Sequence, residues 1–281
     1  MRLLRLLLRS AGGRVAGPVA AGVVLGALAG TASAADLEPS PPAAPVVAAA
    51  PVADADALVV TGTFYLWATK LSGTTSTLPP LPPTHVDLSF RDVLEDLDGG
   101  IMGAIELRKN RWIVIGDLML TQVSPDGTLP GPYASKVEVV SRSLTLEGAV
   151  LYRLYESDAL NVDAGGGVRY WHLDNSLTIE PGLLPNGFSM SEMEDWADPL
   201  VVGRIQARLG GPWSLTLTGD IGGFGVGSQS TWQVIGTVNY QWNDKLSLRA
   251  GYRALSVDYE NGSFLYDVVM QGPVFGVAYR F

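Results

Sequence analysis

The chain contains no cysteine and only two histidines among its 281 residues. The absence of cysteine excludes a disulfide framework, a thiolate metal site and attachment of a lipid to a cysteine. Charged residues are also scarce, at 17% against 47% hydrophobic residues. After Asp36, charges nevertheless recur too often for an apolar run of about 18 residues, the length that a membrane-spanning helix needs. Insertion into a membrane would therefore have to use strands.

The first 35 residues have the features of an export signal. Four arginines precede Val15–Gly30, an uncharged stretch of small and aliphatic residues, and Ala32-Ser33-Ala34 then offers a small-x-small cleavage site. We predict a signal peptide over residues 1–35, with an uncleaved anchor helix as the alternative. The leader holds four of the 19 basic residues and none of the 28 acidic ones, so the processed chain has a net charge of −13. This acidity argues against nucleic acid as a partner.

Residues 36–57 are rich in proline and alanine and predict a disordered linker. Residues 58–281 form the predicted barrel domain, because segments of alternating polarity recur there between turn residues. The ten predicted strands lie near 59–70, 100–108, 111–122, 139–155, 159–173, 199–209, 212–222, 231–242, 245–257 and 264–281.

The connections between these strands alternate in length. Short ones such as Lys109-Asn110 and Gly210-Gly211 supply the backbone freedom of tight hairpins, whereas 71–99, 123–138 and 174–198 are long. Short turns at one end and long loops at the other are typical of outer-membrane barrels. We predict a closed antiparallel up-and-down transmembrane barrel of ten strands, or of eight if two lie outside the wall. An even number places both termini on the periplasmic side.

One parity of side chains is apolar along the predicted strands, as in the uncharged series Trp213, Leu215, Leu217, Gly219 and Ile221. The opposite parity carries the charges: Glu106, Arg108, Asp117, Glu147, Arg153, Asp163, Arg169, Arg204, Arg208, Asp220, Arg249, Arg253 and Arg280. We predict that these charges neutralise one another in a network that fills a narrow lumen. The alternative is a narrow pore or binding lumen in which the surplus of arginines favours anions.

Aromatic residues of the uncharged parity gather at the short-turn ends and predict a membrane-interface girdle: Trp112, Trp213, Trp242, Tyr279 and Phe281. A soluble barrel, with its apolar side inward, would show the same alternation. The leader, the positions of the tryptophans and the aromatic last strand favour the membrane arrangement.

Several short motifs resemble those of known outer-membrane barrels. They are Tyr65-x-Trp67, Asp87-Leu-Ser-Phe90 with Asp92, Leu94 and Leu97, Glu106-x-Arg108, Arg111-Trp112 with Asp117, Asp220-Ile-Gly-Gly-Phe224, and the ending Phe275-x-Val277-x-Tyr279-x-Phe281. From Thr61 onward the chain resembles small barrels of Gram-negative bacteria related to surface-antigen and opacity-type proteins. Its ending resembles their C-terminal assembly signal; Gly276 fits that signal, and Val274 departs from it because a polar residue is common there. The resemblance implies outer-membrane lipids, lipopolysaccharide and the barrel-assembly machinery as partners, and no particular activity.

Segment 88–98 has the one helical pattern of the predicted barrel domain. Phe90, Val93, Leu94 and Leu97 share a face, and Ser89 with Asp92 resembles a capping box. The segment is expected to be either a lid or plug over the barrel mouth or a surface helix packed on neighbouring loops.

His172 is the only candidate for catalysis that the sequence offers. Asp174 and Asp195 are possible carboxylate partners for water activation, but no hydrolase motif surrounds these residues. The nearby acids are expected to form a solvated loop rather than a calcium site: Glu192, Glu194, Asp195 and Asp198. We therefore predict a non-enzymatic outer-membrane protein without cofactor or metal, with a structural or surface-anchoring role. A narrow porin-like channel and a hydrolase near His172 are the alternatives.

Overall fold

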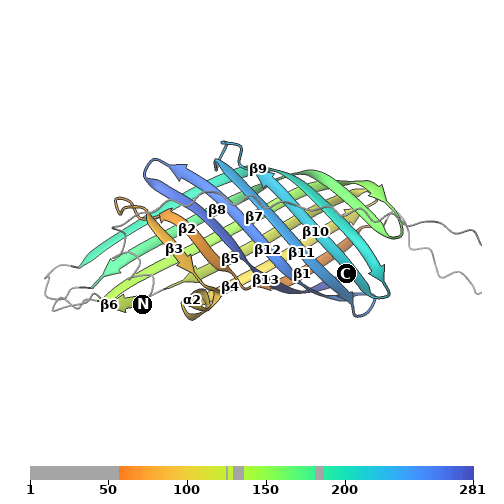
Figure 1. The fold of residues 1–281 in the computed structure, drawn as a ribbon, viewed down its shortest axis with the longest axis horizontal. Coiled ribbons are helices and arrows are strands. Elements are labelled where there is room, and N and C mark those ends of the chain that lie inside the picture. Colours follow the sequence, from red (N-terminus) through yellow and green to blue (C-terminus); the bar gives the residue numbers. More distant parts are fainter. Residues whose placement is uncertain (1–56, 125, 129–135, 181–186) are drawn as a thin grey trace, which may run out of the picture.

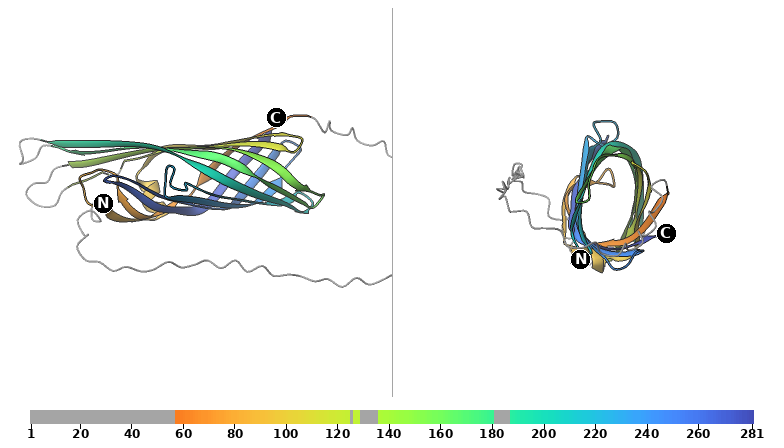
Figure 2. Two further views of the ribbon diagram at one scale, coloured as in Figure 1. Left: turned by 90° about the horizontal axis from the view of Figure 1, so that it is seen from above. Right: turned by 90° about the vertical axis from the view of Figure 1, so that its right-hand side faces the viewer.

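The structure, a computed structural model, describes residues 57–281 except 125, 129–135 and 181–186. The predicted signal peptide and nearly all of the predicted linker lie outside these residues. Ten long strands form the wall of a barrel (Figures 1 and 2): β1 (Val59–Trp67), β4 (Leu97–Lys109), β5 (Trp112–Val123), β7 (Lys136–Glu156), β8 (Leu160–Ile179), β9 (Phe188–Gly210), β10 (Trp213–Gly222), β11 (Ser230–Gln241), β12 (Leu246–Asn261) and β13 (Phe264–Arg280).

The wall closes because β1 pairs with β4 on one side and with β13 on the other. The remaining wall strands pair antiparallel in chain order, and the end view in Figure 2 shows an oval ring. The predicted ten-stranded closed antiparallel barrel is confirmed.

Tight turns join the strands at one end, hereafter the short-turn end. Asn110 (φ 54°) lies in the turn between β4 and β5, and Gly210 (φ 101°) and Gly211 (φ 55°) join β9 to β10. Residues with short or absent side chains adopt these positive φ angles with least strain. The predicted hairpins at these positions are confirmed.

The opposite end, hereafter the long-loop end, holds more regular structure than the sequence suggested. Within the predicted loop 71–99 lie β2 (Lys70–Ser76), β3 (Thr84–Leu88) and α2 (Phe90–Glu95), and β2 extends the wall by pairing with β13. The short strand β6 (Asp126–Thr128) pairs with β7. The prediction of a loop over 174–198 was wrong, since β8 and β9 continue through most of it as paired strands.

The helix α2 begins with the predicted capping box. The Ser89 hydroxyl accepts a hydrogen bond from the Asp92 backbone N–H, and the Asp92 carboxylate accepts one from the Ser89 backbone N–H. It contacts β2 and β3, and the end view in Figure 2 places it outside the ring of strands. Phe90 is 44% exposed. Of the two expectations for this segment, the surface helix is therefore correct and the lid or plug is wrong. In the described part of the chain, none of the helices has both the length and the hydropathy of a membrane-spanning segment.

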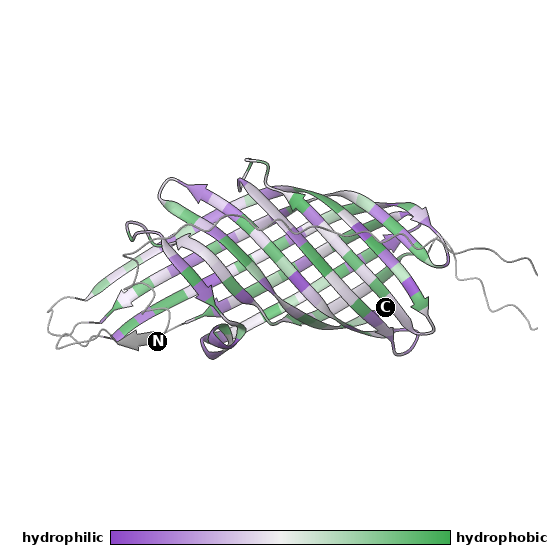
Figure 3. Ribbon diagram, in the orientation of Figure 1, coloured by the Kyte–Doolittle hydropathy of each residue, from purple (hydrophilic) through white to green (hydrophobic). Residues whose placement is uncertain are grey.

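Hydrophobic and hydrophilic residues alternate along many of the wall strands (Figure 3), and so do exposed and buried positions. On β10, Leu217 is 43% exposed, whereas Asp220 is buried at 4%. The outward apolar residues form a band that begins at Trp112, Trp213 and Trp242, all exposed. On β10 it ends near Ile221, and eight residue steps at about 3.3 Å, tilted by about 40°, rise about 20 Å along the barrel axis.

Beyond this apolar band, toward the long-loop end, the outward positions become polar. The Arg142 guanidinium lies 3.1 Å from Gln122 and 3.4 Å from Asp174. His172 Nδ1 lies 2.6 Å from Asp195 on the adjacent strand. The outer surface thus has an apolar band with a polar margin.

Candidate functional site: the charged interior of the barrel

The interior of the barrel changes character from the short-turn end to the long-loop end. Along β8, the inward side chains are Asp163, then Arg169, then Trp171; along β12 they are Arg249, then Arg253, then Tyr259. Three layers follow one another from the short turns: an ion-paired cluster beside an arginine-rich cavity, a charged network in the middle of the barrel, and an aromatic cluster.

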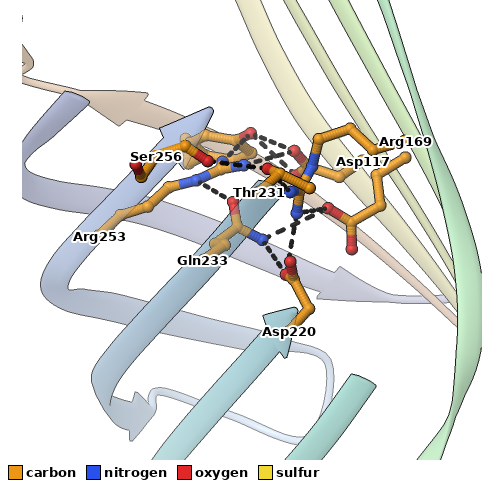
Figure 4. A network of polar contacts seen from close by, with 9 residues as sticks. Asp117, Arg169, Asp220, Thr231, Gln233, Arg253 and Ser256 are labelled. Carbon is orange, nitrogen blue, oxygen red and sulfur yellow. Dashed lines mark hydrogen bonds and ion pairs between the residues drawn. The ribbon is translucent and has the colours of Figure 1, made fainter. Parts of the chain in front are cut away.

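The charged layer in the middle of the barrel is hereafter the central network (Figure 4). It contains Tyr65, Asp117, Glu147, Arg169, Asp220, Thr231, Gln233 and Arg253. These residues come from β1, β5, β7, β8, β10, β11 and β12, so the network crosses the whole lumen.

Arg169 links one half of the central network. Its Nη2 lies 2.7 Å from Glu147 Oε2 and 2.9 Å from Asp220 Oδ2, and its Nη1 donates to Thr231 Oγ1 at 3.1 Å. The Arg169 side chain is fully buried, as is that of Asp220. Charges so far from water are tolerated only when they are paired and hydrogen-bonded.

Arg253 links the other half. Its Nε donates to Gln233 at 2.8 Å, its Nη1 donates to the Tyr65 hydroxyl at 2.8 Å, and its Nη2 lies 3.2 Å from Asp117. The Gln233 amide then donates to Asp220 at 3.0 Å and so joins the two halves. The result is a continuous polar cross-link between opposite walls.

A second group of charges, hereafter the Arg204 cluster, lies closer to the short-turn end. Arg204 Nη2 is 2.8 Å from Asp163, and Arg204 Nη1 reaches Glu106 on β4 at 2.7 Å. Arg153 shares Asp163 at 2.9 Å and contacts Glu156 at 3.2 Å. Because β4 and β9 are not neighbours in the sheet, the contact between Arg204 and Glu106 also spans the lumen.

The lumen toward the long-loop end is filled by an aromatic cluster. Trp196 stacks on Tyr259 with ring centroids 3.9 Å apart and on Trp171 at 5.6 Å. Tyr266 packs edge-on against Trp171, and Trp67 lies under the Arg253 guanidinium at 4.8 Å. Burial raises the pKa of Tyr266 to about 12. Sequence reasoning missed this cluster, although Trp171 and Trp196 have the parity of the charged residues Arg169 and Arg204 on their strands.

Asp198 binds the loop between β10 and β11 at this end of the interior. One of its carboxylate oxygens accepts from the Ser228 backbone N–H at 2.6 Å and from the Ser228 hydroxyl at 2.8 Å; the other accepts from Trp196 Nε1 at 3.2 Å. Asp198 and Ser228 are both fully buried. The acids expected in a solvated loop are therefore dispersed: Asp198 is internal, Glu194 accepts from Tyr259, and Asp195 faces outward.

Two adjacent cavities lie on the short-turn side of the central network. The first, of about 170 Å³, is lined by members of that network and by Arg204. The second, of about 270 Å³ and hereafter the vestibule, is lined mainly by polar side chains near the short turns. Arg249 and Glu106 line both cavities.

The predicted interior charges thus fall into two sets. Nine of them join the central network or the Arg204 cluster: Glu106, Asp117, Glu147, Arg153, Asp163, Arg169, Arg204, Asp220 and Arg253. The other four line the vestibule: Arg108, Arg208, Arg249 and Arg280. Within the described part of the chain, these four make no ion pair.

His172 does not point into the lumen. Its partner Asp195 also accepts from the Tyr170 hydroxyl at 2.7 Å, and these hydrogen bonds from Tyr170 and His172 lower the pKa of Asp195. Across the described segments, His172 has no hydrogen bond to a serine or threonine hydroxyl, and no group of three or more His, Asp or Glu residues is arranged to hold a metal ion. The pair has the geometry of a surface hydrogen bond at the polar margin.

No protein-family model and no curated protein matches the chain. Among solved structures, it is similar to the outer-membrane protease OmpT of Escherichia coli, with 8% identity, 80% of this chain and 97% of that chain covered, and a TM-score of 0.47. The translocator domain of the autotransporter NalP of Neisseria meningitidis has 13% identity, 81% and 90% coverage and a TM-score of 0.40. The attachment invasion locus protein Ail of Yersinia pestis has 10% identity, 80% and 97% coverage and a TM-score of 0.31. These values assign the chain to none of these families.

Proposed function

We propose that this protein is an integral β-barrel of the bacterial outer membrane, with a closed interior and a structural or surface-anchoring role. The observation that carries the proposal is the separation of the two faces of the wall. Large apolar side chains such as Phe64, 76% exposed, cover the outside, while charged side chains such as Arg169 are buried within. A barrel in water would have the opposite arrangement.

The energetics favour hydrocarbon as the surroundings of the apolar band. In water, a continuous apolar belt around the molecule would greatly exceed the few hundred Å² that soluble monomers expose in one patch. In a bilayer, the same belt is buried by acyl chains, and the closed sheet leaves no strand edge unpaired across the membrane. The outward tryptophans at the short-turn end then lie at one interface, where such rings are enriched.

The orientation follows from the unequal ends and from the predicted export signal over residues 1–35. The short turns lie on the periplasmic side, together with both ends of the barrel domain. The extended strands β7, β8 and β9 then project from the cell surface, where their polar outward residues contact lipopolysaccharide. In this proposal β13 is the strand that the barrel-assembly machinery recognises.

The closed interior favours an anchor over a channel. Solute passage would require both the central network and the aromatic cluster to move, and each crosses the lumen. A hydrolase at His172 has less support. The histidine has a carboxylate partner for water activation, but the pair lies on the outer surface, and Asp195 also accepts a hydrogen bond from Tyr170.

Planar-bilayer recording of the purified protein tests the closed interior. We expect no steady conductance from the wild type or from Arg142→Ala, which alters only the outer surface. Arg169→Ala combined with Trp171→Ala removes one residue from each barrier and should produce measurable openings. Steady conductance of the wild type would overturn the anchor proposal in favour of a narrow channel.

A further inference from the structure

The vestibule contains far more positive than negative charge. Six cationic side chains line it: Arg108, Arg153, Arg208, Lys245, Arg249 and Arg280. Its two carboxylates, Glu106 and Glu156, are already engaged by Arg204 and Arg153. Five cations therefore share a cavity of about 270 Å³ without an ion-pair partner among the described residues.

Arg249 is the most informative of these cations. Its Nε is fully buried and has no hydrogen-bond partner in the described part of the chain. The residue lies where the two cavities meet, behind the rim arginines Arg208 and Arg280, which are exposed. The residue as a whole is half-buried, but a buried N–H donor without an acceptor is costly, so Arg249 Nε favours an anion beside it.

A second buried atom without a partner lies in the same vestibule. Asn161 Oδ1, an acceptor, is buried and unpaired among the described residues, and Asn161 lines the cavity with Arg249. Uncharged hydrogen-bonding groups from Ser214, Asn239 and Ser247 complete the lining. The site thus offers several cationic donors together with amide and hydroxyl groups that can accept a hydrogen bond from a ligand.

We infer that the vestibule is a binding site for a small phosphate-bearing anion. Hydrogen phosphate carries several acceptor oxygens for the guanidinium groups and one hydroxyl for an acceptor such as Asn161; a phosphate monoester offers the same acceptor oxygens, and a hydroxyl in its monoanionic form. The volume lies just below the range of pockets for drug-sized molecules, so the anion is small. The central network closes the far side, and the anion enters and leaves at the short-turn end.

Binding of the anion requires only the folded barrel. The further statement that the anion arrives from the periplasm rests on the proposed function, which places the short-turn end on that side of the membrane. Long-range attraction by the surplus of positive charge should bring anions to the rim, and the effect should weaken as salt rises. The exposed arginines at the rim capture the anion, and Arg249 holds it at the inner end.

Isothermal titration of the full processed chain with inorganic phosphate, in a non-ionic detergent at low salt, tests this site. We expect saturable binding of one phosphate per barrel that chloride displaces only at far higher concentration. Arg249→Gln should weaken binding at least tenfold, the effect of losing one charge-assisted hydrogen bond. Arg142→Gln, an arginine on the outer surface, should bind within twofold of the wild type.

Circular dichroism checks that each variant folds, and the double variant Arg208→Gln with Arg280→Gln provides a second probe at exposed positions. It should also weaken binding at least tenfold. No saturable phosphate binding by the wild type, or equal binding by the wild type and both vestibule variants, overturns the inference. The titration uses no membrane, so its failure is distinct from a failure of the anchor proposal, which conductance reports.

Discussion

Replacing Arg169 with methionine removes a guanidinium that joins two buried carboxylates. Its contacts with Glu147 at 2.7 Å and Asp220 at 2.9 Å would disappear, and both acids would remain in the interior. Loss of one partner of a buried ion pair typically costs about 3–5 kcal/mol. Gln233 still donates to Asp220 at 3.0 Å, so we expect the lower part of this range, about 3 kcal/mol.

Urea unfolding of the barrel in lipid vesicles, followed by tryptophan fluorescence, measures this loss. The matched control is Arg142→Met, which removes an arginine whose contact with Asp174 is 3.4 Å long and largely exposed. Such a surface pair contributes less than about 1 kcal/mol. Replacing Glu147 and Asp220 with leucine in the Arg169→Met background should recover most of the lost stability, because no buried charge is then left unpaired. Equal effects of Arg169→Met and Arg142→Met would refute the reasoning.

Three further predictions concern the aromatic cluster, the buried loop contact and the apolar band. Burial raises the pKa of Tyr266 to about 12, so the neutral phenol contributes its full stability below the unfolded pKa near 10 and loses it as the pH rises from about 10 to 12. The difference in unfolding free energy between the wild type and Tyr266→Phe should therefore change only between about pH 10 and 12. Asp198→Ala removes the acceptor of two Ser228 hydrogen bonds and should speed proteolytic cleavage in residues 223–229, whereas an unchanged cleavage rate would contradict the assigned contact. Leu217→Arg should destabilise the barrel in a bilayer by about 2–4 kcal/mol, while Arg142→Leu at the polar margin should change its stability by less than about 1 kcal/mol.

The sequence predicted the barrel wall well wherever the outside is apolar. There, the alternation has to be strict, since a shift of one residue would place every charge on the outer surface. Segments such as 213–221 therefore revealed both their strand and its orientation. The turns at Asn110 and Gly210-Gly211 could also be predicted from the sequence, because their positive φ angles favour these residue types.

Prediction failed beyond the apolar band, where strands face water on the outside. Residues 188–198 of β9 carry acids on both faces, as in Glu194 and Asp195, so their alternation gives no strand signal. The hairpin of β2 and β3 is short and polar, and its position depends on pairing with the distant β13. The aromatic cluster was missed for a related reason. In the sequence, each of its aromatic residues appears as an isolated hydrophobic residue at an inward position, and only the folded barrel places them in contact.

The division of the wall into an outward apolar face and an inward charged face is tested most directly at neighbouring positions of one strand. Because the chain has no cysteine, Leu217→Cys and Thr218→Cys each provide a single attachment point for a spin label. In lipid vesicles, collision rates with oxygen, which concentrates in hydrocarbon, and with a water-soluble nickel complex report the surroundings of the label. We predict high oxygen and negligible nickel accessibility at 217 and reduced oxygen accessibility at 218. Strong nickel accessibility at 217 would contradict the membrane-spanning barrel.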